Sequence, residues 1–149
     1  MYSILKTSTT FLINKGHSKT SATEKFKDYR KPTVYGVGYI GSKIKIPTRE
    51  SNSIIRRLYD LWANMLKRAY GGFDASYLNV TVDSRWYDFT NFLNTIVEVE
   101  GYNRFEKGDL VHLDKDIKCT GNKVYSKDTC MFVSQWENLS DAGSRRWHN

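Results

Sequence analysis

An amphipathic stripe at Ser53–Tyr70 places the strongest limit on what this chain can fold into. The apolar residues recur at helical spacing on one face and are Ile54, Leu58, Leu61, Trp62, Met65, Leu66 and Ala69. Asn52 or Ser53 can cap the start of such a helix, and a Gly-Gly pair follows its end. A helix with one apolar stripe must bury it against other elements. We therefore predict a helix that is the main core element, with Trp62 and Leu66 among the least exposed residues.

The rest of the chain shows shorter patterns of both kinds. They predict a hairpin over Thr33–Ile46, a strand over Tyr77–Arg85, a helix over Trp86–Val97, a loop over Gly101–Gly108, strands over Leu110–Leu113 and Cys130–Val133, and a short helix over Ser134–Leu139. Val80 and Val82 share one face of their strand, and Ser134 with Glu137 fits a capping box. The predicted fold class is α+β, a helical core plus short β-hairpins, in one domain over residues 34–149.

The positive charge is confined to the first third of the chain. Residues 1–50 carry ten Lys and Arg against three Asp and Glu, whereas residues 51–149 carry thirteen of each. Residues 1–33 therefore read as a basic N-terminal arm. Such an arm typically binds phosphates, although lysines can also serve only solubility. The predicted nucleic-acid contacts are Lys25, Lys27, Arg30, Lys31, Lys43, Lys45, Arg56 and Arg57.

Composition and cysteine usage argue against other classes of protein. No apolar run approaches the roughly 18 residues of a membrane span, so no membrane partner is predicted. Cys119 and Cys130 match neither a disulfide framework nor a zinc spacing. We interpret them as reduced thiols of a cytoplasmic protein.

Several residues that could take part in catalysis lie where the Leu110–Leu113 strand ends. Strand alternation puts His112 and Asp114 on one face, and Lys115 and Asp116 follow as the chain leaves the strand. A carboxylate here can hold Mg²⁺, which takes one or two protein oxygens together with phosphate and water. Phosphodiester hydrolysis would then need a base that activates water. In the alternative interpretation, Asp114 only stabilises a turn.

Several segments together resemble HNH-related proteins common in bacteriophage genomes. They are VYGVGYIG, LYDLWANMLKRAY, YLNVTVDSRWYDFTNFL and LDKDIKCTGNKVYSKDTCMFVSQWEN, which fall within residues 34–139 in this order. Such proteins resemble homing endonucleases with a ββα-metal fold, in which a two-stranded ribbon and a helix hold one divalent ion. The resemblance implies a degenerate ββα-metal motif near the C-terminus, a Mg²⁺ cofactor, DNA as the partner, and action in the cytoplasm of the infected bacterial host.

The resemblance also assigns roles to individual residues. Asp114 matches the first metal ligand, and Asn122 matches the loop asparagine that orients the catalytic base. Lys115 stands at the position of the general-base histidine, and Thr129 stands where the second ligand would begin the metal-binding helix. Both residues depart from the family pattern, because a lysine is a poor base at neutral pH and a threonine hydroxyl is a weak ligand.

Nearby residues could replace the missing groups. His112 would be the substitute base, and Asp128 or Asn138 the missing metal ligand. The predicted catalytic set is therefore Asp114, His112, Lys115 and Asn122, and the predicted metal set is Asp114, Asp128 and Asn138.

Three functions remain open from the sequence. The first is a phage-type HNH-like DNA-binding protein with Mg²⁺-dependent endonuclease or nickase activity. The second is a catalytically inactive HNH scaffold that binds nucleic acid or a host protein, which the losses at Lys115 and Thr129 favour. The third is a single-strand or RNA binder that stacks bases on exposed aromatic residues. Target sequence and oligomeric state are not fixed by these patterns.

Overall fold

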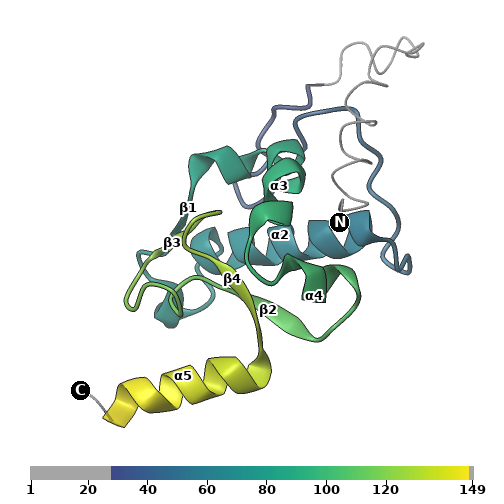
Figure 1. The fold of residues 1–149 in the computed structure, drawn as a ribbon. Coiled ribbons are helices and arrows are strands. Elements are labelled where there is room, and N and C mark those ends of the chain that lie inside the picture. The colour runs from purple at the N-terminus through teal and green to yellow at the C-terminus, as the bar shows by residue number, and fades with distance from the viewer. Residues whose placement is uncertain (1–27, 148–149) are drawn as a thin grey trace.

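The structure, a computed structural model, describes residues 28–147 and is mixed α+β (Figure 1). The α-helices are α2 (Ile54–Tyr70), α3 (Phe89–Thr95), α4 (Tyr102–Glu106) and α5 (Gln135–Trp147), and 3-10 turns occupy Ala75–Tyr77, Ser84–Tyr87 and Ile96–Glu98. One small sheet pairs β1 (Thr81–Val82) with β3 (Val124–Tyr125) in parallel, and the other pairs β2 (Val111–Asp114) with β4 (Met131–Ser134) antiparallel. The predicted α+β class is confirmed.

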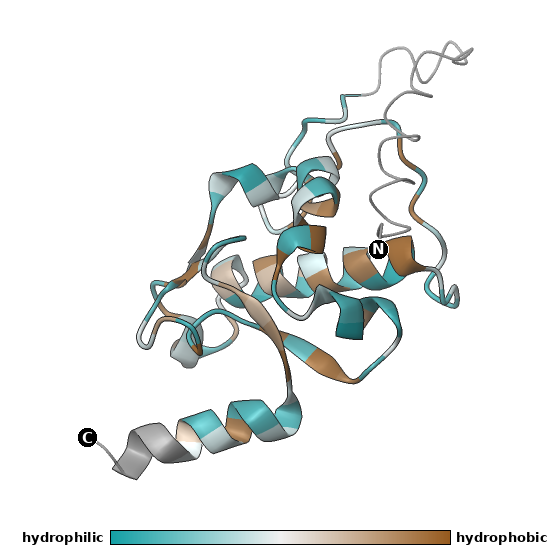
Figure 2. Cartoon of the chain, viewed as in Figure 1, coloured by the Kyte–Doolittle hydropathy of each residue, from teal (hydrophilic) through white to brown (hydrophobic). Residues whose placement is uncertain are grey.

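Helix α2 forms as its stripe predicts. The side chain of Ser53 accepts a hydrogen bond from the backbone N–H of Arg56 at 3.2 Å, and the N–H of Gly71 bonds the last turn. Both Trp62 and Leu66 are fully buried. Figure 2 shows apolar and polar residues alternating along this helix, as one buried and one exposed face require.

Helix α3 and the preceding 3-10 turn complete the core against α2. The ring centroids of Trp62 and Phe89 lie 5.0 Å apart, and the indole N–H of Trp62 donates to the carbonyl oxygen of Trp86 at 2.7 Å. Phe92 and Ile96 are fully buried, so the predicted apolar face is confirmed. The single helix predicted over Trp86–Val97 is instead divided into a 3-10 turn, the helix α3 and a second 3-10 turn.

The hairpin predicted over residues 33–46 is wrong. A single antiparallel bridge joins Val34 to Gly38, and the chain beyond it bonds to a distant segment. The N–H of Tyr39 donates to Tyr87, and the N–H of Phe89 donates back to Tyr39. The backbone groups that were expected to pair within a hairpin thus form their hydrogen bonds with residues distant in the sequence.

The strand predicted over residues 77–85 shrinks to the two residues of β1. Val80 and Val82, which were predicted to share one face, are both buried. The side chains of Asp74 and Asp83, however, accept the backbone N–H groups of Ser76 and Arg85, so 3-10 turns form on both sides of the strand.

Helix α4 replaces the loop predicted over residues 101–108. Tyr102 and Phe105 are buried on its inner side, against Phe132 of β4. Gly101 begins the helix at φ 83°, where a Cβ would lie 2.8 Å from the carbonyl oxygen of Phe132. Gly101, which was predicted to begin a loop, therefore begins a helix at a position where the packing leaves no room for a side chain.

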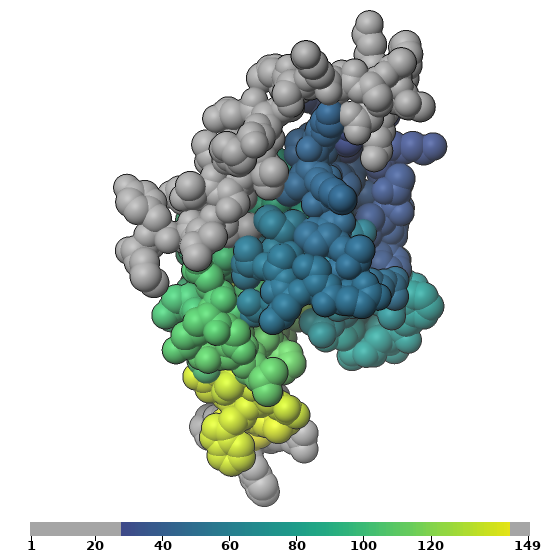
Figure 3. All heavy atoms as spheres, turned by 90° about the vertical axis from the view of Figure 1, so that its right-hand side faces the viewer, coloured from purple at the N-terminus to yellow at the C-terminus, as the bar shows by residue number. Residues whose placement is uncertain are grey.

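The strands β2 and β4 and the helix α5 follow one another at the C-terminal end. Leu113 is buried and its neighbour His112 is exposed, which confirms the predicted alternation. Helix α5 runs to Trp147, well beyond the predicted end at Leu139, and extends away from the core (Figure 1). In Figure 3 its yellow residues lie at one end of the molecule.

Most of the predicted arm, residues 1–27, lies outside the described residues. The part that is described joins the domain, because the N–H of Gly41 donates to Tyr29 and the N–H of Thr33 donates to Gly38. Cys119 and Cys130 are both free thiols. No helix in the described range is long and apolar enough to cross a membrane.

Candidate functional site

The site is carried by β2, β4 and α5, which we call the β2–β4–α5 unit. In the antiparallel register Val111 lies opposite Ser134, and Asp114 lies opposite Met131. The first turn of α5 is fixed by the predicted capping box: the N–H of Ser134 donates to Glu137 at 2.6 Å, and the N–H of Glu137 donates to the Ser134 hydroxyl at 3.2 Å. The N–H of Ser134 is also the main cause of the lowered pKa of the Glu137 carboxyl.

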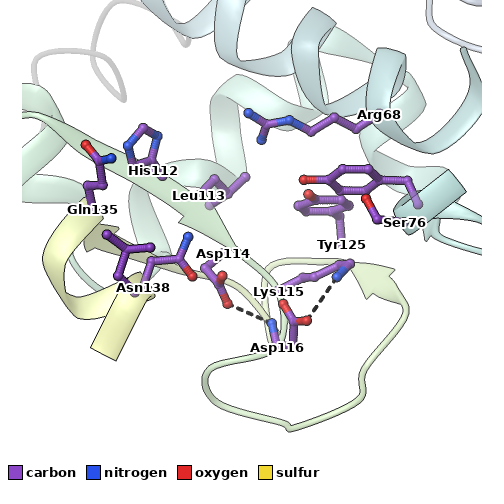
Figure 4. Close-up of a pocket in the computed structure, with 12 residues that line it drawn as sticks. Arg68, Ser76, His112, Leu113, Asp114, Lys115, Asp116, Tyr125, Gln135 and Asn138 are labelled. Carbon is purple, nitrogen blue, oxygen red and sulfur yellow. Dashed lines mark hydrogen bonds and ion pairs between the residues drawn. The ribbon is translucent and has the colours of Figure 1, made fainter. Parts of the chain in front are cut away.

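A cavity of about 540 Å³ opens where β2 ends beside the first turn of α5 (Figure 4). We call it the site cavity. His112 and Asp114 of β2 line it together with Asn138 of α5, while Arg68 of α2 and Tyr125 of β3 line its other side. Lys115 also lines the cavity, so the structure brings together three of the four predicted catalytic residues and, in Asp114 and Asn138, two of the three predicted metal ligands.

One oxygen of Asp114 is already engaged in the turn that ends β2. Oδ1 accepts the backbone N–H groups of Asp116 and Ile117, both at 2.8 Å. The alternative interpretation of Asp114 as a turn-stabilising residue is therefore correct for this oxygen. If Asp114 also binds a metal ion, it would do so through its other carboxylate oxygen, Oδ2.

Lys115, which the resemblance places at the position of the general base, is built into the cavity wall. Its side chain is 9% exposed, and its ammonium lies 3.3 Å from the carboxylate of Asp116. The rings of Tyr77 and Tyr125 flank it, with centroids 6.0 and 5.7 Å from Nζ. An ammonium held by a carboxylate and two aromatic faces acts as a cation within the wall.

Asn122 does not line the cavity but holds its edge. Its side-chain nitrogen donates to the carbonyl oxygens of Lys115 at 2.8 Å and Val124 at 2.7 Å. Asn122 thus joins the end of β2 to β3. It therefore positions the backbone at Lys115.

The other predicted metal positions fall on different sides of the unit. Asn138 lies on the first turn of α5 and faces the cavity, whereas Asp128 does not line it; the Asp128 side chain is 72% exposed and pairs with Lys127 at 3.3 Å. The placement of Thr129 at a helix start is wrong. Thr129 lies in the turn before β4, where its hydroxyl donates to the carbonyl oxygen of Val124.

Arg68 and Gln135 line the cavity but were not among the predicted site residues. Arg68 lies off the apolar stripe of α2, where a charged residue reads as solvated, and only the packing of α2 against the β-strands brings it here. Figure 4 shows it reaching over Tyr125 toward the other wall. Burial raises the pKa of the Tyr125 hydroxyl, and the nearby Arg68 opposes this.

The predicted nucleic-acid contacts divide into three groups. Lys25 and Lys27 lie outside the described residues. Arg30, Lys31 and Lys45 are exposed, and Lys43 is half-buried.

Arg56 and Arg57 form the third group, because both guanidinium groups bind within the protein. Arg56 donates to Asp60 and to the carbonyl oxygen of Pro47. Arg57 donates to the carbonyl oxygens of Phe105 and Glu106 and lies over the Phe105 ring. These two arginines tie α2 to its surroundings, a role that their position off the apolar stripe did not indicate.

The site cavity offers few protein side chains that could bind a metal ion. Within residues 28–147 no three His, Cys, Asp or Glu side chains lie close enough together to hold an ion. The carboxylate of Asp114 and the side-chain amide of Asn138 line the cavity together. One carboxylate and one amide oxygen, completed by water and phosphate, fit the oxygen preference of Mg²⁺.

Comparison of the chain with protein-family models, with curated proteins and with solved structures gave no match. The likeness to HNH-related proteins therefore rests on the sequence segments alone.

Proposed function

We propose that this protein is a phage-type HNH-like protein that binds DNA and nicks one strand with Mg²⁺ at the β2–β4–α5 unit. The observation that carries the proposal is the convergence of His112, Asp114 and Asn138 on one cavity at the end of a two-stranded ribbon and the start of a helix. This is the order of parts that the sequence resemblance implies. The protein would act in the cytoplasm of the infected bacterial host.

The residues of the cavity have complementary roles in this reaction. Oδ2 of Asp114 and the side-chain oxygen of Asn138 would hold Mg²⁺, which when bound stabilises charge on the leaving oxygen. His112 is exposed and stands on the same face of β2 as Asp114, so its imidazole can take the proton of the attacking water. Arg68, opposite them, would neutralise the phosphate.

A second candidate function is binding without cleavage, to nucleic acid or to a host protein. Two observations favour it: Oδ1 of Asp114 is held by the turn, and Lys115 is packed where the base would stand. In this alternative, the β2–β4–α5 unit binds a partner through its surface and catalyses no reaction.

A supercoiled-plasmid assay with Mg²⁺ or Mn²⁺ separates the two candidates. We expect the wild type to convert supercoiled plasmid to the nicked form, and His112→Ala to lower the rate by roughly 10²–10⁴-fold. Lys115→Met, which keeps the buried volume, should lower it less than His112→Ala. DNA binding without nicking under either metal would leave the binding module, and no binding at low salt would favour a host-protein partner.

A further inference from the structure

A second cavity, of about 720 Å³, lies on the polar face of α2. We call it the α2 cavity; it shares no lining residue with the site cavity. The helix contributes Arg56, Tyr59, Asp60, Ala63, Asn64 and Lys67. These residues recur at the spacing of one helical face. The small side chain of Ala63 leaves space between its larger neighbours.

A tight turn places Tyr35 at the rim of this cavity. Tyr35 and Gly36 have φ angles of 49° and 77°, and the turn is closed by the bridge between Val34 and Gly38. Gly38 fixes the turn to α2, since a Cβ there would lie 2.5 Å from Cδ1 of Leu66. The backbone at Gly38 therefore packs closely against α2, which places the turn beside the helix.

The backbone conformation of Tyr35 is unusual for its residue type. Left-handed φ values favour glycine and asparagine, and a bulky side chain there costs free energy. Tyr35 is 41% exposed, so its side chain is only partly buried against the rest of the protein. Non-glycine residues held in the left-handed region are often found at binding sites.

The charge of the α2 cavity favours an anion. Arg49, Arg56 and Lys67 line it against the single carboxylate of Asp60, which is bonded to Arg56. Glu50 lies near Arg49 and Arg56 but does not line the cavity. Arg49 and Lys67 thus give the walls a positive charge beyond that of the Arg56–Asp60 pair.

We propose that the α2 cavity binds a nucleotide. The ring of Tyr35 would stack on the base, Arg49 and Lys67 would bind the phosphate, and the amide of Asn64, which both donates and accepts, would bond the edge of the base. The nucleotide is either one unit of a single strand or a free mononucleotide. This inference is independent of the function proposed for the β2–β4–α5 unit, because the two cavities share no residue.

The test uses the intact protein and two probes. Fluorescence anisotropy measures the affinity for a labelled dT12 strand at low salt, and unlabelled AMP is added as a competitor. In Tyr35→Asn the stacking ring is removed and the new residue accepts the left-handed backbone, so the fold should be kept. We expect this variant to bind dT12 roughly tenfold more weakly.

Two further variants address the phosphate. Arg49→Gln should lower the slope of log K against log salt by about 0.7 for each phosphate of a single strand that the protein no longer neutralises. Lys107→Gln removes the same charge from a side chain that is 65% exposed and does not line the α2 cavity, and it should leave the affinity for dT12 unchanged.

The outcomes separate the sources of the nucleotide and the two proposals. Competition by AMP supports a free-nucleotide site; Tyr35-dependent dT12 binding without such competition supports a strand. Asp114→Asn should keep full dT12 binding, so loss of plasmid nicking would bear only on the β2–β4–α5 unit. The proposal is overturned if the wild type binds neither probe, if Tyr35→Asn binds dT12 as tightly as the wild type, or if Lys107→Gln weakens dT12 binding as much as Arg49→Gln.

Discussion

The side-chain amide of Asn122 donates a hydrogen bond of 2.8 Å to the backbone carbonyl oxygen of Lys115. The same nitrogen also bonds the carbonyl oxygen of Val124, and Oδ1 accepts the N–H of Val124 at 3.3 Å. One side chain thus joins the turn after β2 to the start of β3. The edge of the site cavity depends on this link, because Asp114 precedes Lys115 in the chain.

Asn122→Asp should therefore destabilise the fold. Aspartate keeps the size of the side chain but has no N–H to donate, so the two carbonyl oxygens are left without their donor. We expect the free energy of unfolding to fall by about 1–2 kcal/mol, measured by urea denaturation. Asn103→Asp, the same change at an exposed position of α4, serves as the control. An equal decrease in both variants would show that the Asn122 bonds contribute nothing specific.

Asp114→Asn tests the metal ligand without breaking the turn. The amide oxygen of asparagine can still accept the N–H groups of Asp116 and Ile117, whereas the negative charge is removed. We expect Mg²⁺-dependent nicking to disappear while duplex DNA binding stays within about twofold, since the predicted phosphate-binding lysines are untouched. Asp128→Asn, outside the cavity, should nick plasmid as the wild type does. Equal activity of the two variants would exclude Asp114 as a ligand.

Neutralising Lys25, Lys27, Arg30 and Lys31 with glutamine should weaken the binding of duplex DNA and its salt dependence together. The slope of log K against log salt should fall by about 0.9 for each phosphate that the variant no longer neutralises. The measurement is a series of binding titrations between low and moderate salt. Glutamine at Lys107 and Lys118, which lie in the second half of the chain, is the control. An unchanged slope in the first variant would place the DNA-binding residues elsewhere.

Leu66→Ala should destabilise the protein by about 2–5 kcal/mol, because Leu66 is fully buried and the truncation leaves a cavity beside Trp62. Leu78→Ala removes the same atoms from a side chain that is 71% exposed and should cost little. Thermal or urea denaturation of both variants gives the difference. Similar stability of the two would contradict the role of α2 as the centre of the core.

Burial raises the pKa of the Cys130 thiol to about 12 from its ordinary value of 9.0. In the native state iodoacetamide should thus alkylate the exposed Cys119 and spare Cys130, because the thiolate is the reactive form. Mass spectrometry before and after unfolding in urea counts the modified thiols. Native labelling of Cys130 at the rate of Cys119 would contradict its burial.

The same shift predicts the direction of the stability change with pH. The unfolded chain releases the Cys130 proton near pH 9 and the folded chain only near pH 12. The contribution to stability is therefore complete below pH 9 and is lost as the pH rises toward 12. Cys130→Ala should make the decrease in stability above pH 9 less steep than in the wild type, which urea denaturation at a series of pH values measures.

The sequence by itself determined the elements whose cause is local. The stripe of α2, the faces of β2 and the capping box of Ser134 and Glu137 all follow from spacing within a few residues, and each was predicted. Such patterns are readable because a helix or strand repeats its own geometry along the chain. The likeness of residues 34–139 to HNH-related proteins likewise comes from the order of segments in the sequence.

Only the tertiary structure decided which residues distant in the sequence come into contact. Tyr39 bonds to Tyr87 and not to a neighbouring strand, β1 pairs with β3, and Lys115 enters the cavity wall instead of solvent. Arg56 and Arg57 read as a charged outer face, yet both bind backbone carbonyl groups of other segments. Each outcome depends on which distant groups satisfy a buried charge or an unpaired backbone group, and that is set by the packing of α2 against the rest of the domain.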